Sequence, residues 1–191
     1  MNRLMKSLFS LLITGSLAAC APAMTPTEAP PVANASPTSA PMPSDGSPPP
    51  ASLEIDGATQ TAGVGSYCWN SQTGTGEAVG MCVDKIGIPT VRDPLLATSP
   101  LKARLILPLA DSPTQLNLSV FPATEDNEVI VGGGAEEFRY WMPAEGLSRE
   151  LAHETSQEIT MELEPGLYVF YVFAVWEGKG DVSYGFLVEV K

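Results

Sequence analysis

The chain has 191 residues, of which 44% are hydrophobic, and its 22 acidic and 10 basic side chains give a formal net charge of −12. This acidic balance argues against nucleic acid or an anionic lipid surface as a binding partner, because both are negatively charged themselves. The length allows one domain with its own hydrophobic core, together with flanking segments.

The N-terminus has the pattern of an export signal. Arg3 and Lys6 provide a short positive start, and residues 8–17 form an apolar run that only small residues interrupt. A membrane-spanning helix needs ~20 apolar residues, so this run is too short to cross a bilayer. Its length and its basic flank are typical of a secretory signal peptide.

Cys20 follows the apolar run directly. Leu17-Ala18-Ala19-Cys20 resembles the lipobox of bacterial lipoproteins. The resemblance implies that residues 1–19 are a signal peptide and that lipid is attached to the cysteine sulfur and to the new amino group. Two or more acyl chains anchor a protein firmly, because each buried CH₂ contributes ~0.8 kcal/mol. We therefore expect a protein anchored to a membrane of the bacterial cell envelope, with its domain outside the cytoplasm. The alternative is an ordinary secreted protein without lipid.

Residues 20–52 are predicted to form a disordered tether that starts at the lipidated cysteine. They are almost wholly Ala, Pro, Thr and Ser, contain ten of the 18 prolines, and include no aromatic residue. Such a segment buries too little apolar surface to offset its conformational entropy. Because proline favours extended conformations, the tether would reach on the order of 100 Å when fully extended. Its expected role is that of a spacer.

Residues 53–191 are predicted to form a single β domain. Apolar and polar residues alternate along several short segments, and alternation places one set on a buried face and the other toward water. The predicted strands are residues 103–107, 115–120, 138–142, 158–163 and 182–190. Residues 144–155 are expected to hold a short helix or a loop.

Residues 167–176 are apolar on both faces, which predicts a strand in the middle of a sheet. The second face must then be covered by residues 68–82, by residues 144–155 or by another molecule. The turn-forming residues 177–181 follow and predict a hairpin with the last strand. Along that last strand, the alternation places Leu187 among the residues that face water.

Glu164-Pro165-Gly166-Leu167-Tyr168 resembles the start of the penultimate strand of immunoglobulin-like and fibronectin-type domains. In such domains a tyrosine hydroxyl bonds back to the backbone of the corner. The resemblance implies this role for Tyr168, as a marker of the fold. With the many short strands, it leads us to expect an all-β protein with a single immunoglobulin-like antiparallel β-sandwich, preceded by the signal peptide and the disordered Pro-rich linker.

Cys68 and Cys82 remain once Cys20 is assigned to the lipid. An exported chain reaches an oxidising compartment, where an even pair of cysteines predicts a disulfide. Closing a loop of this size stabilises a protein by roughly 3 kcal/mol in the chain-entropy model. A metal site or a redox-active pair is disfavoured, because the chain has no Cys-x-x-Cys and its one histidine lies far from both cysteines.

No residue set in the sequence indicates catalysis. His153, the only histidine, lies in a polar stretch, which is typical of a solvated side chain. Residues 125–128 are rich in oxygen ligands but lack the spacing of a calcium loop. The glycine-rich residues 131–135 lack the Lys and Ser/Thr of a phosphate loop. We therefore predict no enzyme, no cofactor and no metal.

Tyr171 and Trp176 are the candidate binding residues, because aromatic side chains are enriched among those that anchor partners. For a lipid-anchored envelope protein we expect a non-catalytic binding or scaffolding role, with an envelope protein or polysaccharide as partner. The alternatives are a protease-inhibitor-like module, whose loops enter an active-site cleft, and an envelope hydrolase that uses paired carboxylates. Fold class alone favours none of these functions.

Overall fold

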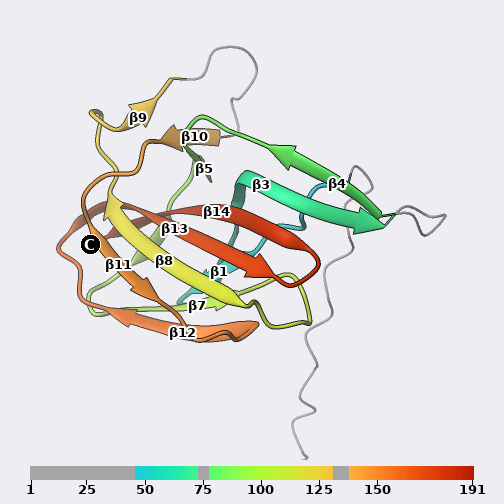
Figure 1. Ribbon diagram of the computed structural model, residues 1–191. Helices are drawn as coiled ribbons and strands as arrows, with labels where there is room; N and C mark the ends of the chain where they lie inside the picture. The colour runs from blue at the N-terminus through green and yellow to red at the C-terminus, as the bar shows by residue number, and fades with distance from the viewer. Residues whose placement is uncertain (1–45, 73–77, 131–137) are drawn as a thin grey trace, which may run out of the picture. The chain divides into compact units, whose positions relative to one another are not determined.

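The computed structural model describes residues 46–72, 78–130 and 138–191, all of which belong to one compact unit, Ser36–Lys191 (Figure 1). Within these residues the secondary structure is fourteen strands and no helix, so the predicted all-β class is confirmed. The strands are β1 (Ser52–Ile55), β2 (Ala58–Thr61), β3 (Gly63–Gln72), β4 (Ala78–Val83), β5 (Ile88–Val91), β6 (Leu95–Ala97), β7 (Leu101–Ile106), β8 (Gln115–Pro122), β9 (Glu128–Val129), β10 (Phe138–Trp141), β11 (Leu147–Glu150), β12 (Ser156–Met161), β13 (Gly166–Trp176) and β14 (Gly180–Val190).

The strands form three sheets. The back sheet has the order β12-β7-β1-β2, and the cover sheet has the order β5-β10-β9. The central sheet has the order β11-β8-β13-β14-β3-β4, with β6 added beside β14. The pairs are antiparallel except β14 with β6. Figure 1 shows β8, β13 and β14 side by side, with β5 and β10 on one side of them and β7 and β12 on the other.

The main core lies between the back sheet and the central sheet. Phe170 on β13, Phe186 on β14 and Leu105 on β7 are fully buried and belong to one cluster. Each such side chain contributes ~1.5–3 kcal/mol when it is fully buried. Two antiparallel sheets that share a core in this way form a sandwich-like arrangement.

The cover sheet packs against the opposite face of the central sheet. Val169 on β13 and Leu187 on β14 are 0% exposed. They form a second cluster with Ile88, Phe121 and Trp141. The second face of β13 is therefore covered over part of its length by β5 and β10, and not by residues 68–82 or 144–155 as predicted. The prediction that Leu187 faces water is wrong for the same reason.

Gly63 and Gly185 let β5 approach the central sheet closely, and Gly65 leaves room for the Ser183 side chain within that sheet. Gly63 and Gly65 lie on β3, and Gly185 lies opposite Gly63 on β14. A Cβ on Gly63 or Gly185 would collide with the backbone carbonyl oxygen of Pro89, and one on Gly65 would collide with the Ser183 hydroxyl. Glycine is required at positions 63 and 185 because one backbone lies directly against another there.

Polar contacts hold the cover sheet together. The indole Nε1 of Trp141 donates a buried hydrogen bond to Thr90 Oγ1 at 2.9 Å. Without this partner the buried N–H would cost ~1–3 kcal/mol. Arg139 lies 4.4 Å from the centre of the Trp141 ring and donates two hydrogen bonds of 2.8 Å to the Glu128 carboxylate. The hydrogen bonds from Arg139 lower the pKa of Glu128 below its ordinary value.

Most predicted elements are found with small shifts at their ends. The segments predicted as strands lie in β7, β8, β10, β12, β13 and β14. The predicted hairpin joins β13 to β14, and its turn uses φ angles of 72° at Gly178 and 114° at Gly180. The Tyr168 hydroxyl donates to the carbonyl oxygen of Glu164 at 2.9 Å, which confirms the predicted corner hydrogen bond. Residues 144–155, expected to be a helix or a loop, instead contain β11, which pairs with β8.

The packed domain begins before residue 53. Pro48 and Pro49 are buried, and the Tyr184 hydroxyl donates to the carbonyl oxygen of Pro49 at 3.0 Å. The Ala62 amide donates to the Ala51 carbonyl at 2.9 Å. Residues 46–52 therefore belong to the folded part, which corrects the predicted end of the tether. Proline suits this position, because its ring is apolar and it has no backbone N–H that needs a partner.

Candidate functional site

The two predicted binding residues lie on opposite faces of β13. Tyr171 is partly buried and packs beside Val169 on the side of the cover sheet. Trp176 is 2% exposed and belongs to the main core. Its ring lies edge-on to Trp69 at 5.8 Å, and its Nε1 donates to the carbonyl oxygen of Asp111 at 2.9 Å. Trp176 is therefore a core residue, which corrects its place in a binding surface.

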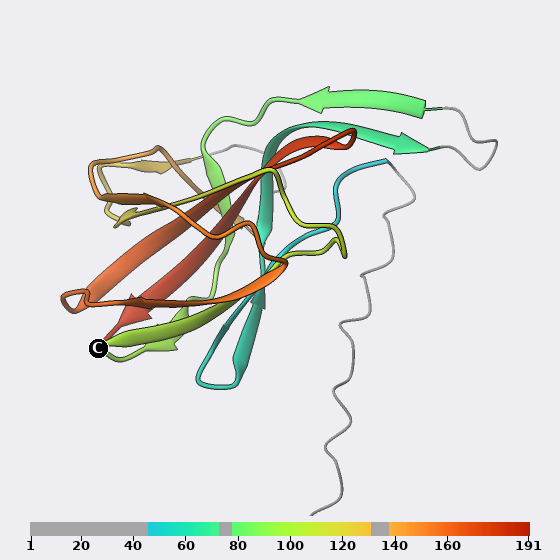
Figure 2. The ribbon, with the colours of Figure 1, turned by 60° about the horizontal axis from the view of Figure 1, so that its bottom comes forward.

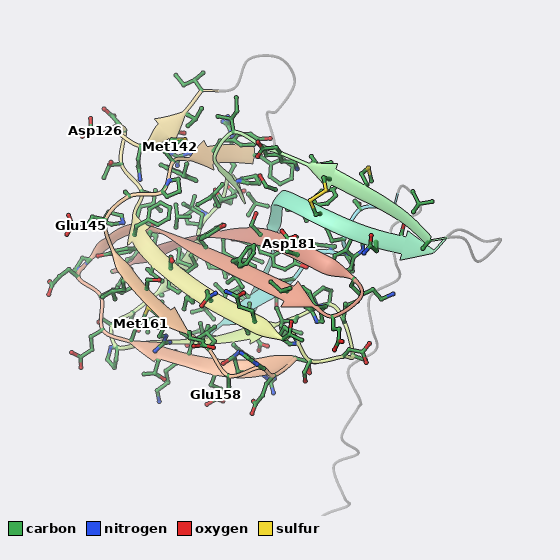
Figure 3. The ribbon with its side chains drawn as sticks, in the orientation of Figure 1. Asp126, Met142, Glu145, Glu158, Met161 and Asp181 are labelled. Carbon is green, nitrogen blue, oxygen red and sulfur yellow. A yellow bond between two sulfur atoms is a disulfide. The ribbon has the colours of Figure 1, made fainter. Side chains whose placement is uncertain are left out.

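Beyond the edge of the cover sheet, the outward side of the central sheet carries aromatic and polar side chains together. Tyr171 and Phe173 are half-buried there, two positions apart on one face of β13. The register places Ser119 of β8 beside Tyr171, and Asn117 of β8 and Ser183 of β14 on either side of Phe173. Asp181 lies one step further along the same face of β14 (Figure 3). We call this set the outer-face patch; it consists of Asn117, Ser119, Tyr171, Phe173, Asp181 and Ser183.

Hydrogen bonds hold the polar members of the outer-face patch in place. The Ser183 hydroxyl donates to the Ser66 carbonyl at 2.9 Å, and the Ser119 and Ser148 hydroxyls lie 3.1 Å apart. Burial and, to a smaller extent, the nearby Asp181 carboxylate raise the pKa of Tyr171, whereas a hydrogen bond with Ser183 lowers it. The Tyr171 hydroxyl therefore stays protonated at neutral pH. The patch offers two aromatic rings for stacking, several hydrogen-bonding groups and one negative charge.

Cys68 and Cys82 form a disulfide, as predicted. They lie directly opposite each other on β3 and β4. Figure 3 shows the bond between the two strands, and Figure 2 shows the strands running side by side. Asp181 lies opposite Cys68 across the β14–β3 pair, so the disulfide lies one strand away from the outer-face patch. The bond closes a loop with a sequence separation of 14 and so has a structural role.

Replacing both Cys68 and Cys82 by serine is expected to lower the free energy of unfolding by roughly 3 kcal/mol, because the open loop gains conformational entropy in the unfolded chain. Urea unfolding followed by tryptophan fluorescence measures this loss. Wild-type protein in reductant should match the double variant. In denaturant without reductant, neither cysteine should react with a thiol reagent, and labelling of either one would contradict the disulfide.

The other candidate groups in the sequence have structural partners or lie outside the described residues. The His153 side chain is 43% exposed, and its Nε2 lies 3.4 Å from the Glu150 carboxylate. Asn127 Oδ1 accepts from the Thr124 amide at 2.8 Å, so this part of the oxygen-rich segment closes a turn. Residues 131–135 lie outside the described residues. In the parts of the chain that the structure describes, no group of three or more His, Cys, Asp or Glu side chains is arranged to hold a metal ion.

The predicted lipid-attachment residue, Cys20, lies outside the described residues, as does the predicted signal peptide. Among residues 46–72, 78–130 and 138–191, no helix is long and apolar enough to cross a membrane. The lipid anchor therefore stays a prediction.

Phe173 is the functional candidate that the sequence analysis missed. The signal for it was present, because a strand alternates between its two faces and position 173 shares a face with 171. Phe138 and Tyr140, which line a cavity described below, likewise share a face of a predicted strand, but no pattern in the sequence places Lys85 beside them. Lys85, which precedes β5, is distant in the sequence from β10, and the pairing of β5 with β10 brings the two to one cavity.

No protein-family model matches the chain, and no curated protein matches it significantly.

Proposed function

We propose that this protein is a lipoprotein of the bacterial cell envelope, anchored through Cys20, with a non-catalytic binding or scaffolding role. The observation that carries the proposal is Leu17-Ala18-Ala19-Cys20, which directly follows a basic start and a short apolar run. The Pro-rich residues after Cys20 serve as a spacer between the membrane and the folded domain. The partner is an envelope protein or a polysaccharide.

The outer-face patch is the binding surface in this proposal. Tyr171 and Phe173 lie half-buried in a sheet face that also carries the partly buried Asn117, Ser119, Val175 and Asp181 and the buried Ser183. Aromatic side chains of this kind contribute much of the binding energy at protein surfaces. They bury a large apolar area at little cost in conformational entropy, because their rotamers are already restricted by packing.

An immunoglobulin-like arrangement of the sandwich is part of the proposal. One sheet has β11, β8, β13 and β14 side by side in that order, and the other sheet has β12 beside β7. Immunoglobulin-like domains divide successive strands of the chain between their two sheets in the same way. The hydrogen bond from Tyr168 to Glu164 corresponds to the tyrosine corner of that fold. In this scheme β1–β5 and the β9–β10 pair are additions to the common sandwich.

Substitution of Phe173 by serine is expected to reduce partner recovery by about ten-fold, the effect of removing one well-packed aromatic contact. Full-length protein is captured from solubilised envelope, and separately mixed with insoluble envelope polysaccharide, and the bound fraction is measured. Ile86→Ser is the matched control, because Ile86 is 74% exposed and lies outside the patch.

One outcome argues against the patch as the binding surface: Phe173→Ser recovers as much partner as the wild type does, and Ile86→Ser loses the partner. Turnover of an envelope substrate by the pure wild-type protein would overturn the non-catalytic role itself. Circular dichroism of both variants shows whether the fold is kept.

A further inference from the structure

We propose that a cavity beside Lys85 binds a small carboxylate that has an apolar or aromatic body. The cavity has a volume of ≈ 320 Å³ and lies where β3, β5 and β10 meet. Ligand pockets usually measure about 300–1,000 Å³, so this one suits a small molecule. The proposal goes beyond the envelope-binding role, and the cavity shares no residue with the outer-face patch.

The walls of the cavity are mainly apolar and come from segments that the fold holds in place. Phe138 and Tyr140 lie on one face of β10, and Tyr140 pairs with Pro89 of β5. Pro89 is buried against Gly63 and Gly185, so this wall rests on the backbone of the central sheet. Val64 on β3 completes the apolar surface. Such a surface favours the hydrocarbon part of a ligand.

Among the residues that the structure describes, Lys85 provides the only charge on the cavity wall, in a protein whose net charge is −12. Its backbone amide donates to the Ser66 hydroxyl at 2.9 Å, and its Nζ donates to the Val64 carbonyl oxygen at 2.7 Å. An ammonium group has three N–H donors, so two remain for a ligand. Partial burial lowers the pKa of Lys85, which is the effect of placing an ammonium group at an apolar surface.

No carboxylate in the described parts of the chain forms an ion pair with Lys85. Asp84 precedes it in the chain, but the Asp84 carboxylate accepts a hydrogen bond from the Ser66 hydroxyl at 3.0 Å. Among the described residues, the ion pairs are those of Arg139 with Glu128 and of His153 with Glu150. A ligand carboxylate would therefore supply the counter-charge, and the Thr61 and Tyr140 hydroxyls on the wall would supply further donors.

The test uses 2-naphthoate as the probe and 2-naphthalenemethanol as its uncharged analogue. Both are titrated calorimetrically into full-length protein in detergent micelles, with empty micelles subtracted. Wild type should bind 2-naphthoate at one saturable site and bind the alcohol more weakly. Lys85→Met keeps the apolar stem and removes the charge, so its dissociation constant for 2-naphthoate should rise about ten-fold or more.

Three further variants make the result specific. Lys85→Arg keeps the positive charge and should retain most of the affinity. Lys179→Met removes a lysine from the β13–β14 turn and should bind as wild type does. Tyr140→Ala should weaken binding of both probes, because the aromatic wall contacts the ring and not the carboxylate. The proposal is overturned by equal 2-naphthoate affinity in wild type and Lys85→Met, or by the absence of saturable binding to wild type at millimolar probe.

Discussion

Cys20→Ala is expected to transfer the protein from the membrane fraction to the soluble fraction outside the cytoplasm. The substitution leaves the basic start and the apolar run of the proposed signal peptide intact, so export should continue. It removes the sulfur that the lipobox resemblance assigns to lipid attachment. Because each buried CH₂ of an acyl chain contributes ~0.8 kcal/mol, loss of the chains should abolish stable membrane binding.

The measurement combines membrane fractionation with metabolic labelling by an alkyne analogue of palmitate. Wild type should carry the label and sediment with membranes, and Cys20→Ala should do neither. Ala21→Ser, next to the cysteine, is the control and should behave as wild type does. A Cys20→Ala protein that keeps the label, or that stays on the membrane after a high-salt wash, would refute the lipobox assignment.

Gly185→Ala is expected to destabilise the domain by about 3 kcal/mol, the upper end of the cost usually seen at overpacked sites. The new methyl group would collide with the Pro89 carbonyl oxygen and lie too close to the Ile88 side chain. A side chain can rotate away from such a clash, but the Pro89 carbonyl belongs to the backbone of β5. The cover sheet must therefore move away from β14, which uncovers Leu187 and Trp141.

Urea unfolding gives the loss in free energy, and tryptophan fluorescence of the folded state reports whether Trp141 becomes solvated. Gly166→Ala is the matched control, because its Cβ would lie 3.5 Å from the nearest atom, in ordinary van der Waals contact. Equal stability of Gly185→Ala and wild type would mean that β5 does not rest on the backbone of β14.

The candidate site could be predicted from the sequence only in part. Tyr171 was selected as an aromatic residue on a strand that is apolar on both faces, and it lies in the outer-face patch. Trp176 was selected with it, although the two positions are five residues apart and a strand alternates at every residue. Applied strictly, that periodicity would have replaced Trp176 with Phe173. The same alternation places Phe138 and Tyr140 on one face of a predicted strand, but no local pattern in the sequence places Lys85 beside them.

The sequence by itself determined the local features of this protein. Alternation of apolar and polar residues predicted the strands, because successive side chains of a strand point to opposite faces of the sheet. The residues 177–181 predicted the hairpin, because glycines at the turn tolerate the positive φ that it needs. The cysteine count predicted the pair Cys68–Cys82, because Cys20 was already assigned and an exported chain is oxidised.

Only the tertiary structure decided what covers the second face of β13. The cover sheet brings Ile88 and Trp141 onto Val169 and Leu187, although these residues are far apart in the sequence. Alternation identifies two faces of a strand, but it cannot say whether the second face meets water or another sheet. That depends on the close approach of the β5 backbone to the glycines of β3 and β14, which is a contact between backbones and leaves no hydrophobic pattern in the sequence.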